Sequence, residues 1–450
     1  MRISTLPAGL LWGSPLCWEY AADEALQAER ALLAATIDEG PFEALYADGH
    51  RGQPGWPTGV LVRALVVQRQ HGWHDRELVR QMQDNCRVRV LLGLPLGTRE
   101  APSKTVLGDF RRAVIGAGMG VELWAQQMTA LAPSGLIDVA QDDFALDSTP
   151  LLAAVAQPTV IGLLEHAVRR VLLPLVHVDS SAAAELARRW PVGPWMAKRF
   201  SRCSSGVSGR AGQRRWRKCF RLANRVLEAV RKLPEHPKLA GPLRTLARVL
   251  EERGADGLGR PQDRLTNALD TDARFGRKGH APHKITWHGY KASVAMHVPT
   301  GLLLAPIVDP ANRPDGEALG PSLDRIAAGF ADHAPGRLHA DSAYTARELR
   351  AEATLRRTVL IGPRLGKRRR GRVRGGGRVA RRADRAVRAQ VERGHAQLVR
   401  IRDNRRSWYL GLDKTDYQLS MSVVANNLQR LLALLLAHRL ELSPKLRALT

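Results

Sequence analysis

The order of the expected strands and helices in the second half of the chain constrains its fold most. Residues 143–149 predict a strand, and residues 284–308 predict a hairpin, because aromatic and β-branched residues flank a Pro-Thr-Gly turn. Helical patterns follow, and short β-branched segments separate them. The expected helices cover 315–331, 345–355, 380–402 and 418–439, and the short strands cover 337–340 and 358–361.

A helical segment at 150–262 interrupts this series. Without it, the order is strand, hairpin, helix, strand, helix, strand, helix, which fits a mixed sheet with helices on its faces. The order matches an RNase-H-like core, whose first three strands form a meander. We therefore expect an α/β protein with this core at 136–149 and 263–440 and a C-terminal tail at 441–450.

The first third of the chain shows only helical signals. Residues 20–35 and 57–94 predict helices, with Asp75 as a candidate cap, and Ser103 precedes a short basic helix at 104–114. We expect residues 1–135 to form an all-helical domain that binds DNA ends or dimerises; a simple packing module is the alternative. Its charge is nearly neutral, so any DNA contact there is local. The candidates are Lys104, Arg111 and Arg112.

The positive charge of the chain lies in two segments. The 450 residues carry a formal charge of +26. Residues 150–260 hold 21 Lys and Arg against 8 Asp and Glu, residues 364–406 hold 17 against 3, and the remainder sums to −1. Codon bias can favour arginine throughout a chain, but it does not remove acids from two segments. We therefore favour phosphate binding as the cause, with nucleic acid as the leading partner.

The two basic segments differ in their expected structure. Residues 150–262 predict a basic helical insertion, with a loop at 201–212, and residues 366–378 predict a Gly/Arg-rich loop. Trp216 lies inside a basic run, where it either stacks on an extruded base or packs inward with Phe220; we favour packing. The DNA-binding candidates beside it are Arg214, Arg215 and Arg217.

Several protein classes are disfavoured by composition. Four cysteines without a CxxC pair support neither a disulfide scaffold nor a zinc ribbon. The longest apolar run, 431–437, is too short to span a bilayer, so we expect no membrane partner and a cytoplasmic location. Four histidines without a cysteine partner alternate through a loop and a strand, and we reject them as a zinc site. They are His280, His283, His288 and His297.

Three carboxylates fall where an RNase-H-like core would bring them together. Asp147 lies on the first strand, Asp341 at the carboxyl end of the expected fourth strand, and Glu392 on the late basic helix. Three carboxylates can hold a pair of divalent ions, and phosphoryl transfer on DNA uses such a pair. All-oxygen ligands suit Mg²⁺.

Each acid also has a structural alternative. Asp147 could cap a turn, in which case Asp142 or Asp143 would be the working residue. Asp341 could be a helix N-cap, and Glu392 could pair with Arg388 at i−4.

Two further residues near these acids have competing interpretations. His395, three residues after Glu392, could assist proton transfer, but a structural role is favoured. Lys291 could reach a phosphate or remain solvated on its strand.

Four stretches of the chain are similar to bacterial insertion-sequence transposases of the DDE superfamily. Residues 57–112 resemble their N-terminal helical domain, and "FALDSTP" resembles the segment with the first catalytic Asp. Residues 270–344, from "DTDARFGRKG" to "HADSAY", resemble the strands that lead to the second Asp. Residues 388–428 resemble the segment with the catalytic Glu, and the four stretches together span well over half of the chain.

The resemblance implies roles for individual residues. Asp147, Asp341 and Glu392 would be the metal-binding triad, with two Mg²⁺ ions for which Mn²⁺ substitutes. Arg388 would contact a phosphate of the transposon end. Many relatives place a Tyr seven residues before the Glu and a Lys seven after it. Here these positions are Arg385 and Val399, and Arg400 lies one position beyond.

The resemblance also implies the reaction and its partners. The protein would cut DNA at terminal inverted repeats and transfer the freed 3′-hydroxyl to target DNA. A homodimer would hold the two ends, and the location would be the nucleoid of the bacterial cytoplasm. The alternatives are a metal-dependent nuclease without joining activity and a non-catalytic DNA-binding protein derived from a transposase.

Overall fold

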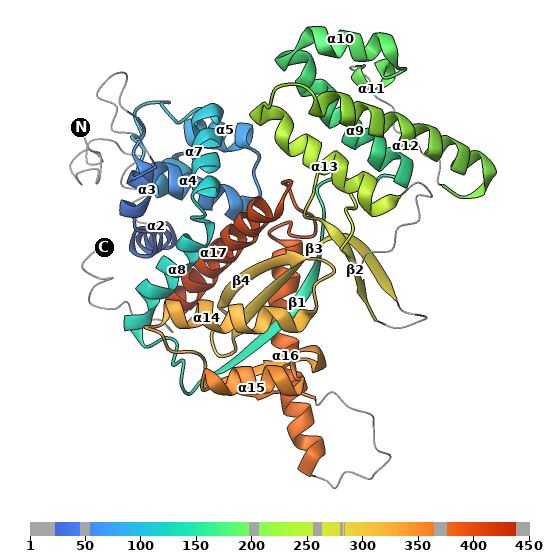
Figure 1. Ribbon diagram of the computed structural model, residues 1–450. Helices are drawn as coiled ribbons and strands as arrows, with labels where there is room; N and C mark the ends of the chain where they lie inside the picture. The colour runs from blue at the N-terminus through green and yellow to red at the C-terminus, as the bar shows by residue number, and fades with distance from the viewer. Residues whose placement is uncertain are drawn as a thin grey trace.

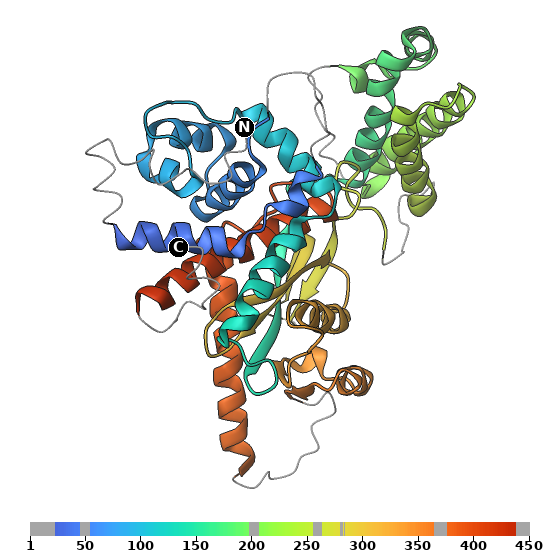
Figure 2. The ribbon, with the colours of Figure 1, turned by 90° about the vertical axis from the view of Figure 1, so that its left-hand side faces the viewer.

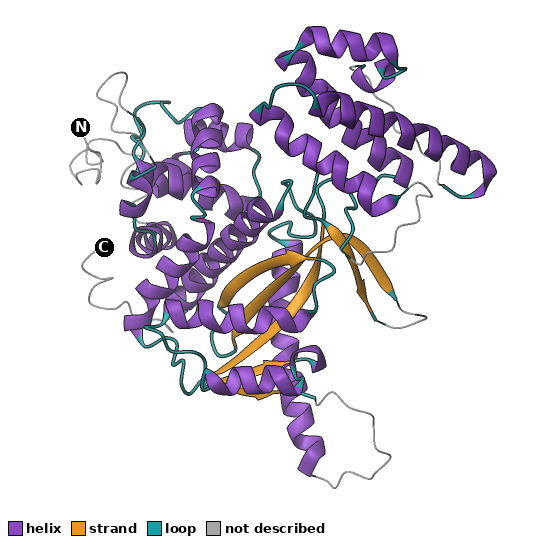
Figure 3. Cartoon of the chain, in the orientation of Figure 1, coloured by secondary structure: helices purple, strands orange, loops and turns teal. Residues whose placement is uncertain are grey.

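The computed structural model describes residues 23–45, 55–197, 207–254, 263–279, 282, 284–363 and 376–437, and side chains of the last range from 384 onward. A curved sheet occupies the centre, N-terminal helices flank it on one side, and a separate helical module lies on the other (Figure 1). Among the described residues helices outnumber strands, and Figure 3 shows helices on several sides of the sheet.

Six strands form one mixed sheet in the order β2-β3-β1-β5-β6, and β4 pairs with β3. Strand β3 pairs antiparallel with β1, and β4 pairs antiparallel with β3. Strand β5 pairs parallel with β1, and β6 pairs parallel with β5. This is the RNase-H-like fold that the element order predicts. The strands are β1 (Asp143–Leu152), β2 (Arg274–Lys278), β3 (Ile285–His297), β4 (Leu303–Pro310), β5 (Arg337–Ala340) and β6 (Val359–Ile361).

Strand β2 is a correction to the sequence analysis, whose order of elements has no strand between the insertion at 150–262 and the hairpin. It pairs with the first residues of β3, from Ile285 to Gly289, and therefore extends the meander. Asp341 consequently follows the fifth strand and not the fourth. Gly289 has a φ of +150°, and a Cβ there would lie 2.3 Å from the carbonyl oxygen of Leu151. Strand β3 can approach β1 this closely at Gly289 because glycine has no side chain.

Helices cover both faces of the sheet. Figure 2 shows α16 (Gly376–Arg400) on one face and α14 (Leu319–Gly329) with α15 (Arg347–Leu355) on the other. Helix α16 contacts β1, β3 and β5. The two candidate acids of the strands therefore share their sheet with the helix that carries Glu392.

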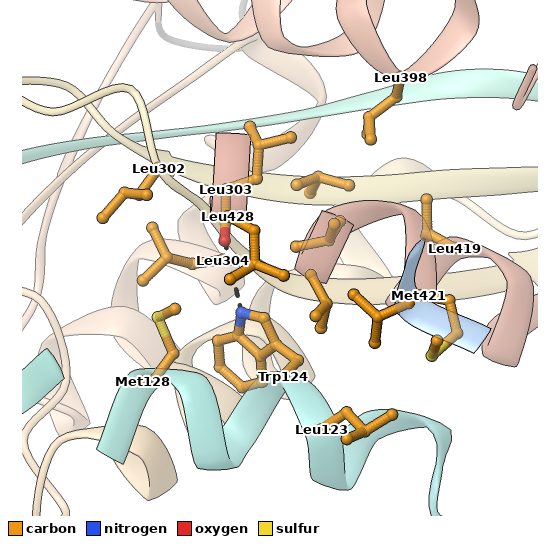
Figure 4. Close-up of a cluster of buried hydrophobic side chains, with 14 of the residues drawn as sticks. Leu123, Trp124, Met128, Leu302, Leu303, Leu304, Leu398, Leu419, Met421 and Leu428 are labelled. Atoms are coloured by element: carbon orange, nitrogen blue, oxygen red, sulfur yellow. Dashed lines mark hydrogen bonds between the residues drawn. The ribbon is translucent and has the colours of Figure 1, made fainter. Parts of the chain in front are cut away.

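The N-terminal helices share one hydrophobic core with the sheet. Helix α17 (Leu412–Leu436) contacts β4 and also four N-terminal helices, α2, α4, α7 and α8. In Figure 4, Trp124 of α8 lies among leucines of β4 and α17, and its Nε1 donates to the carbonyl oxygen of Leu303 at 3.4 Å. The helices are α2 (Glu24–Thr36), α3 (Gly40–Glu43), α4 (Thr58–His71), α5 (Asp75–Asp84), α6 (Cys86–Leu92), α7 (Lys104–Gly116) and α8 (Gly120–Leu131).

Asp75 is not the N-cap of α5, although the sequence analysis names it as a candidate cap. It is the first residue of α5, and the N-cap position belongs to His74. The Asp75 carboxylate instead accepts hydrogen bonds from Gln68 at 2.8 Å and from Arg111 at 2.6 Å. These bonds connect α5 with α4 and α7.

The insertion between β1 and β2 has a hydrophobic core of its own. We call its helices the insertion module, in which α9 contacts each of the other four. Helix α12 begins at Gly209, inside the expected loop, and residues 201–206 lie outside the described ranges. The helices are α9 (Val160–Val178), α10 (Ser180–Arg189), α11 (Gly193–Met196), α12 (Gly209–Arg231) and α13 (Pro237–Arg253).

Two other expected segments fall largely outside the described ranges. Of the Gly/Arg-rich loop at 366–378, only the start of α16 from Gly376 is described, and the tail at 441–450 is not. Within the described part of the chain, α17 alone is long and apolar enough to cross a bilayer by length and composition. Because 67% of its apolar window is buried inside the protein, it serves as a core helix.

Candidate functional site

Asp147 and Asp341 occupy equivalent positions on neighbouring parallel strands. Leu146 of β1 is in register with Ala340 of β5, and each acid is the next residue along its chain. Side chains at equivalent positions of parallel strands point to the same face, and adjacent strands lie about 5 Å apart. The fold therefore brings Asp147 and Asp341, the first two predicted acids, to neighbouring positions on one face of the sheet.

Each aspartate uses one carboxylate oxygen locally. Oδ1 of Asp147 accepts from the main-chain N–H of Ser148 at 2.8 Å. The strand continues to Leu152, so no turn follows Asp147 and the turn-capping alternative is wrong. Oδ1 of Asp341 accepts from the N–H of Ala343 at 2.8 Å and caps the short 3-10 helix Ser342–Tyr344. The N-cap role is thus real, and it leaves the second oxygen of Asp341 available.

Glu392 lies on α16 at the border between its buried face and solvent. Val391 and His395 face the sheet, whereas Glu392 is exposed. Gly394 lets the helix approach closely, since a Cβ there would lie 2.8 Å from a methyl group of Leu303. Nε2 of His395 lies 3.1 Å from the main-chain oxygen of Asp147. Helix α16 is therefore held against β1 one turn after Glu392.

His395 is buried against the sheet. Burial lowers its pKa, although the nearby carboxylates of Asp147 and Glu392 act in the opposite direction. A neutral imidazole with a proton on Nε2 can donate to the Asp147 oxygen. Its Nδ1 has no hydrogen-bond partner among the described residues. These contacts support the structural role for His395.

Lys278 is a cation of the site that the sequence analysis missed. Its Nζ donates to the carbonyl oxygen of Ser148 at 3.3 Å, and its charge helps to lower the pKa of His395. Lys278 ends β2, the strand that was not expected. Its only sequence signal was membership of the stretch "DTDARFGRKG".

The alternative acids Asp142 and Asp143 lie at the amino-terminal start of β1, and each has a partner on a neighbouring strand. Oδ2 of Asp142 lies 2.9 Å from Nε2 of the buried His297. Asp143 pairs with Arg337 of β5 at 2.8 Å. Both acids therefore join strands, and neither lies beside Asp341.

The described residues contain no ready-made metal cluster. No three His, Cys, Asp or Glu side chains within them lie together as a metal site. Of the four histidines rejected as zinc ligands, His280 and His283 lie outside the described ranges. His288 contacts Thr266, and His297 contacts Thr300 and Asp142.

From residue 384 onward, no basic side chain of α16 forms an ion pair with Glu392. Nε of Arg388 lies 3.4 Å from Oδ2 of Asp384, so the predicted Arg388–Glu392 ion pair is not present. Arg385 and Arg400 are exposed, and Arg400 is the last residue of the helix.

Two predicted DNA-binding residues are engaged inside the protein. Nζ of Lys291 donates to Asp315 and to the carbonyl oxygen of Arg313, each at 2.5 Å, so Lys291 is neither solvated nor free for phosphate. Burial alone would lower the pKa of Arg111, but its bond to Asp75 raises the pKa overall. Arg111 is therefore part of the helical packing.

The remaining N-terminal candidates stay accessible. Lys104 begins α7 with an exposed side chain. Arg112 is also exposed and pairs with Asp109 one turn earlier.

The insertion module separates its tryptophan from its arginines. Trp216 is fully buried, and its ring centroid lies 5.7 Å from that of Phe220. It packs inward, as favoured, and cannot stack on a base. Arg214 and Arg217 are exposed, and Arg215 lies 3.7 Å from Glu165.

Two family models match the chain. Residues 22–113 match the model described as Transposase domain (DUF772), and residues 252–428 match the model described as Transposase DDE domain. The second match covers β2 to β6, α16 and most of α17. Searches of curated proteins and of solved structures found no match.

Proposed function

We propose that this chain, which belongs to the DDE transposases, cuts DNA at the ends of a transposable element and joins the freed 3′-hydroxyl to target DNA. The observation that carries the proposal is the register of β1 and β5, which sets Asp147 beside Asp341. The bond from His395 to Asp147 brings the helix of Glu392 to the same strand. Asp147, Asp341 and Glu392 are the proposed catalytic residues.

The proposed donors fit a hard divalent cation. Asp147 and Asp341 each commit Oδ1 to a main-chain N–H and keep Oδ2 available. Together with the exposed Glu392, they offer oxygen donors only, which suits two Mg²⁺ ions, or Mn²⁺ in their place. When bound, such ions lower the pKa of an attacking water or 3′-hydroxyl and stabilise the leaving oxygen.

The protein residues around these acids position the reacting phosphate. Lys278 and Arg388 place positive charge at the rim of the site, where a DNA phosphate would approach. Arg385 and Arg400 extend this charge along α16. Strand transfer requires two ends to be held together, so we propose a homodimer with terminal inverted repeats and target DNA as its partners.

The test is a comparison of two aspartates on the same sheet. Asp341→Ala should abolish Mg²⁺-dependent cutting of the element's own terminal repeats and leave binding of these ends unchanged. Asp143→Asn is the matched control, because Asp143 lies on β1 but pairs with Arg337. It should cut at a rate close to that of the wild type.

Each possible result has a distinct meaning. Cutting by folded Asp341→Ala would reject the proposed site, and loss of cutting in folded Asp143→Asn would favour the other end of β1. A wild-type protein that cuts but never joins a 3′-hydroxyl to plasmid is a nuclease. A wild-type protein that binds ends without cutting them is a DNA-binding derivative of a transposase.

A further inference from the structure

Helix α12 carries a row of six exposed cations on one face. Successive members are three or four residues apart, with Lys218 beside Arg217, so they share one side of the helix. At 1.5 Å per residue the row extends for about 22 Å along the helix axis. We call it the α12 cationic row: Arg210, Arg214, Arg217, Lys218, Arg221 and Arg225.

The opposite face of α12 fixes the direction of this row. Trp216, Ala223 and Val226 are fully buried in the core of the insertion module, against α9 and α13. The helix therefore cannot turn its arginines inward without exposing these residues. The orientation of the row is set by packing, and the cations are presented to solvent together.

Cations on α10 and α13 have carboxylate partners on their own helices, but the members of the α12 cationic row do not. Glu185 of α10 pairs with Arg188 at 2.6 Å, and Arg248 of α13 pairs with Glu252 at 2.5 Å. No member of the row forms an ion pair with a carboxylate within the described residues. Arg215, on the same helix but outside the row, is the one that reaches Glu165.

Such a row is unfavourable for an ordinary solvated surface. Like charges at i and i+4 destabilise a helix, and Arg214 has Arg210 on one side and Lys218 on the other at this spacing. Typical surfaces intersperse both signs. A partner with regularly spaced negative charges would remove the repulsion. Duplex DNA is such a partner, since it carries one charge for about every 1.7 Å of its axis.

We propose that the α12 cationic row binds the phosphate backbone of duplex DNA, independently of base sequence. Five of its six members are arginines, whose planar donors match phosphate oxygens. The insertion module connects β1, which carries Asp147, to β2, which carries Lys278 (Figure 1). The inference rests on the proposed function. It assigns to the insertion module the binding of the DNA that flanks the cut site.

The experiment compares two variants of the full-length protein that lose the same number of charges. One combines Arg214→Gln, Arg217→Gln, Arg221→Gln and Arg225→Gln in the row. The control also removes four exposed cations from the insertion module, but at the end of α12 and on α13. Its substitutions are Arg231→Gln, Lys232→Gln, Lys238→Gln and Arg244→Gln.

Binding is measured by fluorescence anisotropy, with a labelled mixed-sequence duplex longer than the row, over a series of sodium chloride concentrations. Each phosphate contact contributes about one unit to the slope of log affinity against log salt, so the row variant should lose about four units. The control should keep nearly the whole slope. Melting temperature and circular dichroism verify that both variants are folded.

The possible outcomes are distinguishable. A folded row variant with the wild-type slope overturns the inference, and so does an equal loss in both variants. If the row variant loses slope but wild-type protein never cuts its own ends, the proposed function fails and the DNA-binding surface stands. If the row variant keeps its slope while Asp341→Ala loses cutting, only the inference about α12 fails.

Discussion

Nε2 of His395 lies 3.1 Å from the main-chain oxygen of Asp147, and this contact joins the helix of the third proposed acid to the strand of the first. Glu392 precedes His395 by three residues, so both lie within one helical turn. Gly394, between them, allows α16 to approach Leu303 and Met296. The position of Glu392 relative to the sheet therefore depends on this pair of contacts.

His395→Phe should lower the cutting rate without weakening DNA binding. Phenylalanine fills the buried space but cannot donate to Asp147, so α16 loses its attachment to β1. A misplacement of about 1 Å in a catalytic group can cost on the order of 100-fold in rate. Single-turnover cutting in Mg²⁺ measures the rate, and anisotropy measures binding.

His395→Gln is the matched control for this prediction, because its amide can still donate a hydrogen bond. It should recover part of the lost rate. A His395→Phe protein that cuts at the wild-type rate would show that packing alone positions Glu392.

Much of the sheet could be predicted because its strands have local signals. The expected strand at 337–340 coincides with β5, a short segment between Gly336 and Asp341. The hairpin of β3 and β4 was also predicted from β-branched residues on both sides of a turn. The expected core topology placed Asp147 and Asp341 near each other, and the register of β1 and β5 was observed only in the structure.

Other features depend on tertiary contacts that a local pattern does not encode. Strand β2 contains Gly276 and three cations, so it has no strand signature, and it forms because β3 extends beyond β1. Lys291 looks like a solvated strand residue until Asp315 is seen beside it. In both cases, a residue or strand distant in the sequence determines the observed structure.

Chelation of divalent ions should stop cutting while the fold persists. The proposed acids lie on β1, at the end of β5 and on α16, whose hydrophobic contacts hold the elements without a metal. We expect EDTA to abolish cutting and Mg²⁺ to restore it, with the melting temperature nearly unchanged. A large fall in melting temperature on chelation would instead indicate a structural ion.

Trp216→Ala should destabilise the insertion module more than the rest of the protein. Truncation of a buried Trp costs about 3–5 kcal/mol, and this ring is fully buried in a core separate from that of the sheet. Urea unfolding followed by fluorescence should show an early transition. Trp216→Phe, which keeps the contact with the Phe220 ring, should show a smaller shift. A single unshifted transition in Trp216→Ala would contradict the separate core.

Acid should destabilise the protein through His297. Burial lowers the pKa of this histidine, and its bond to Asp142 opposes the shift without cancelling it. The folded state therefore binds fewer protons than the unfolded state. The stabilisation is complete above the ordinary histidine pKa of about 6.5 and is lost as the pH falls below it. One such histidine changes the free energy of unfolding by at most about 1.4 kcal/mol per pH unit. Melting temperatures across this range should fall with acid less steeply in His297→Gln, and equal slopes would exclude His297 as a source.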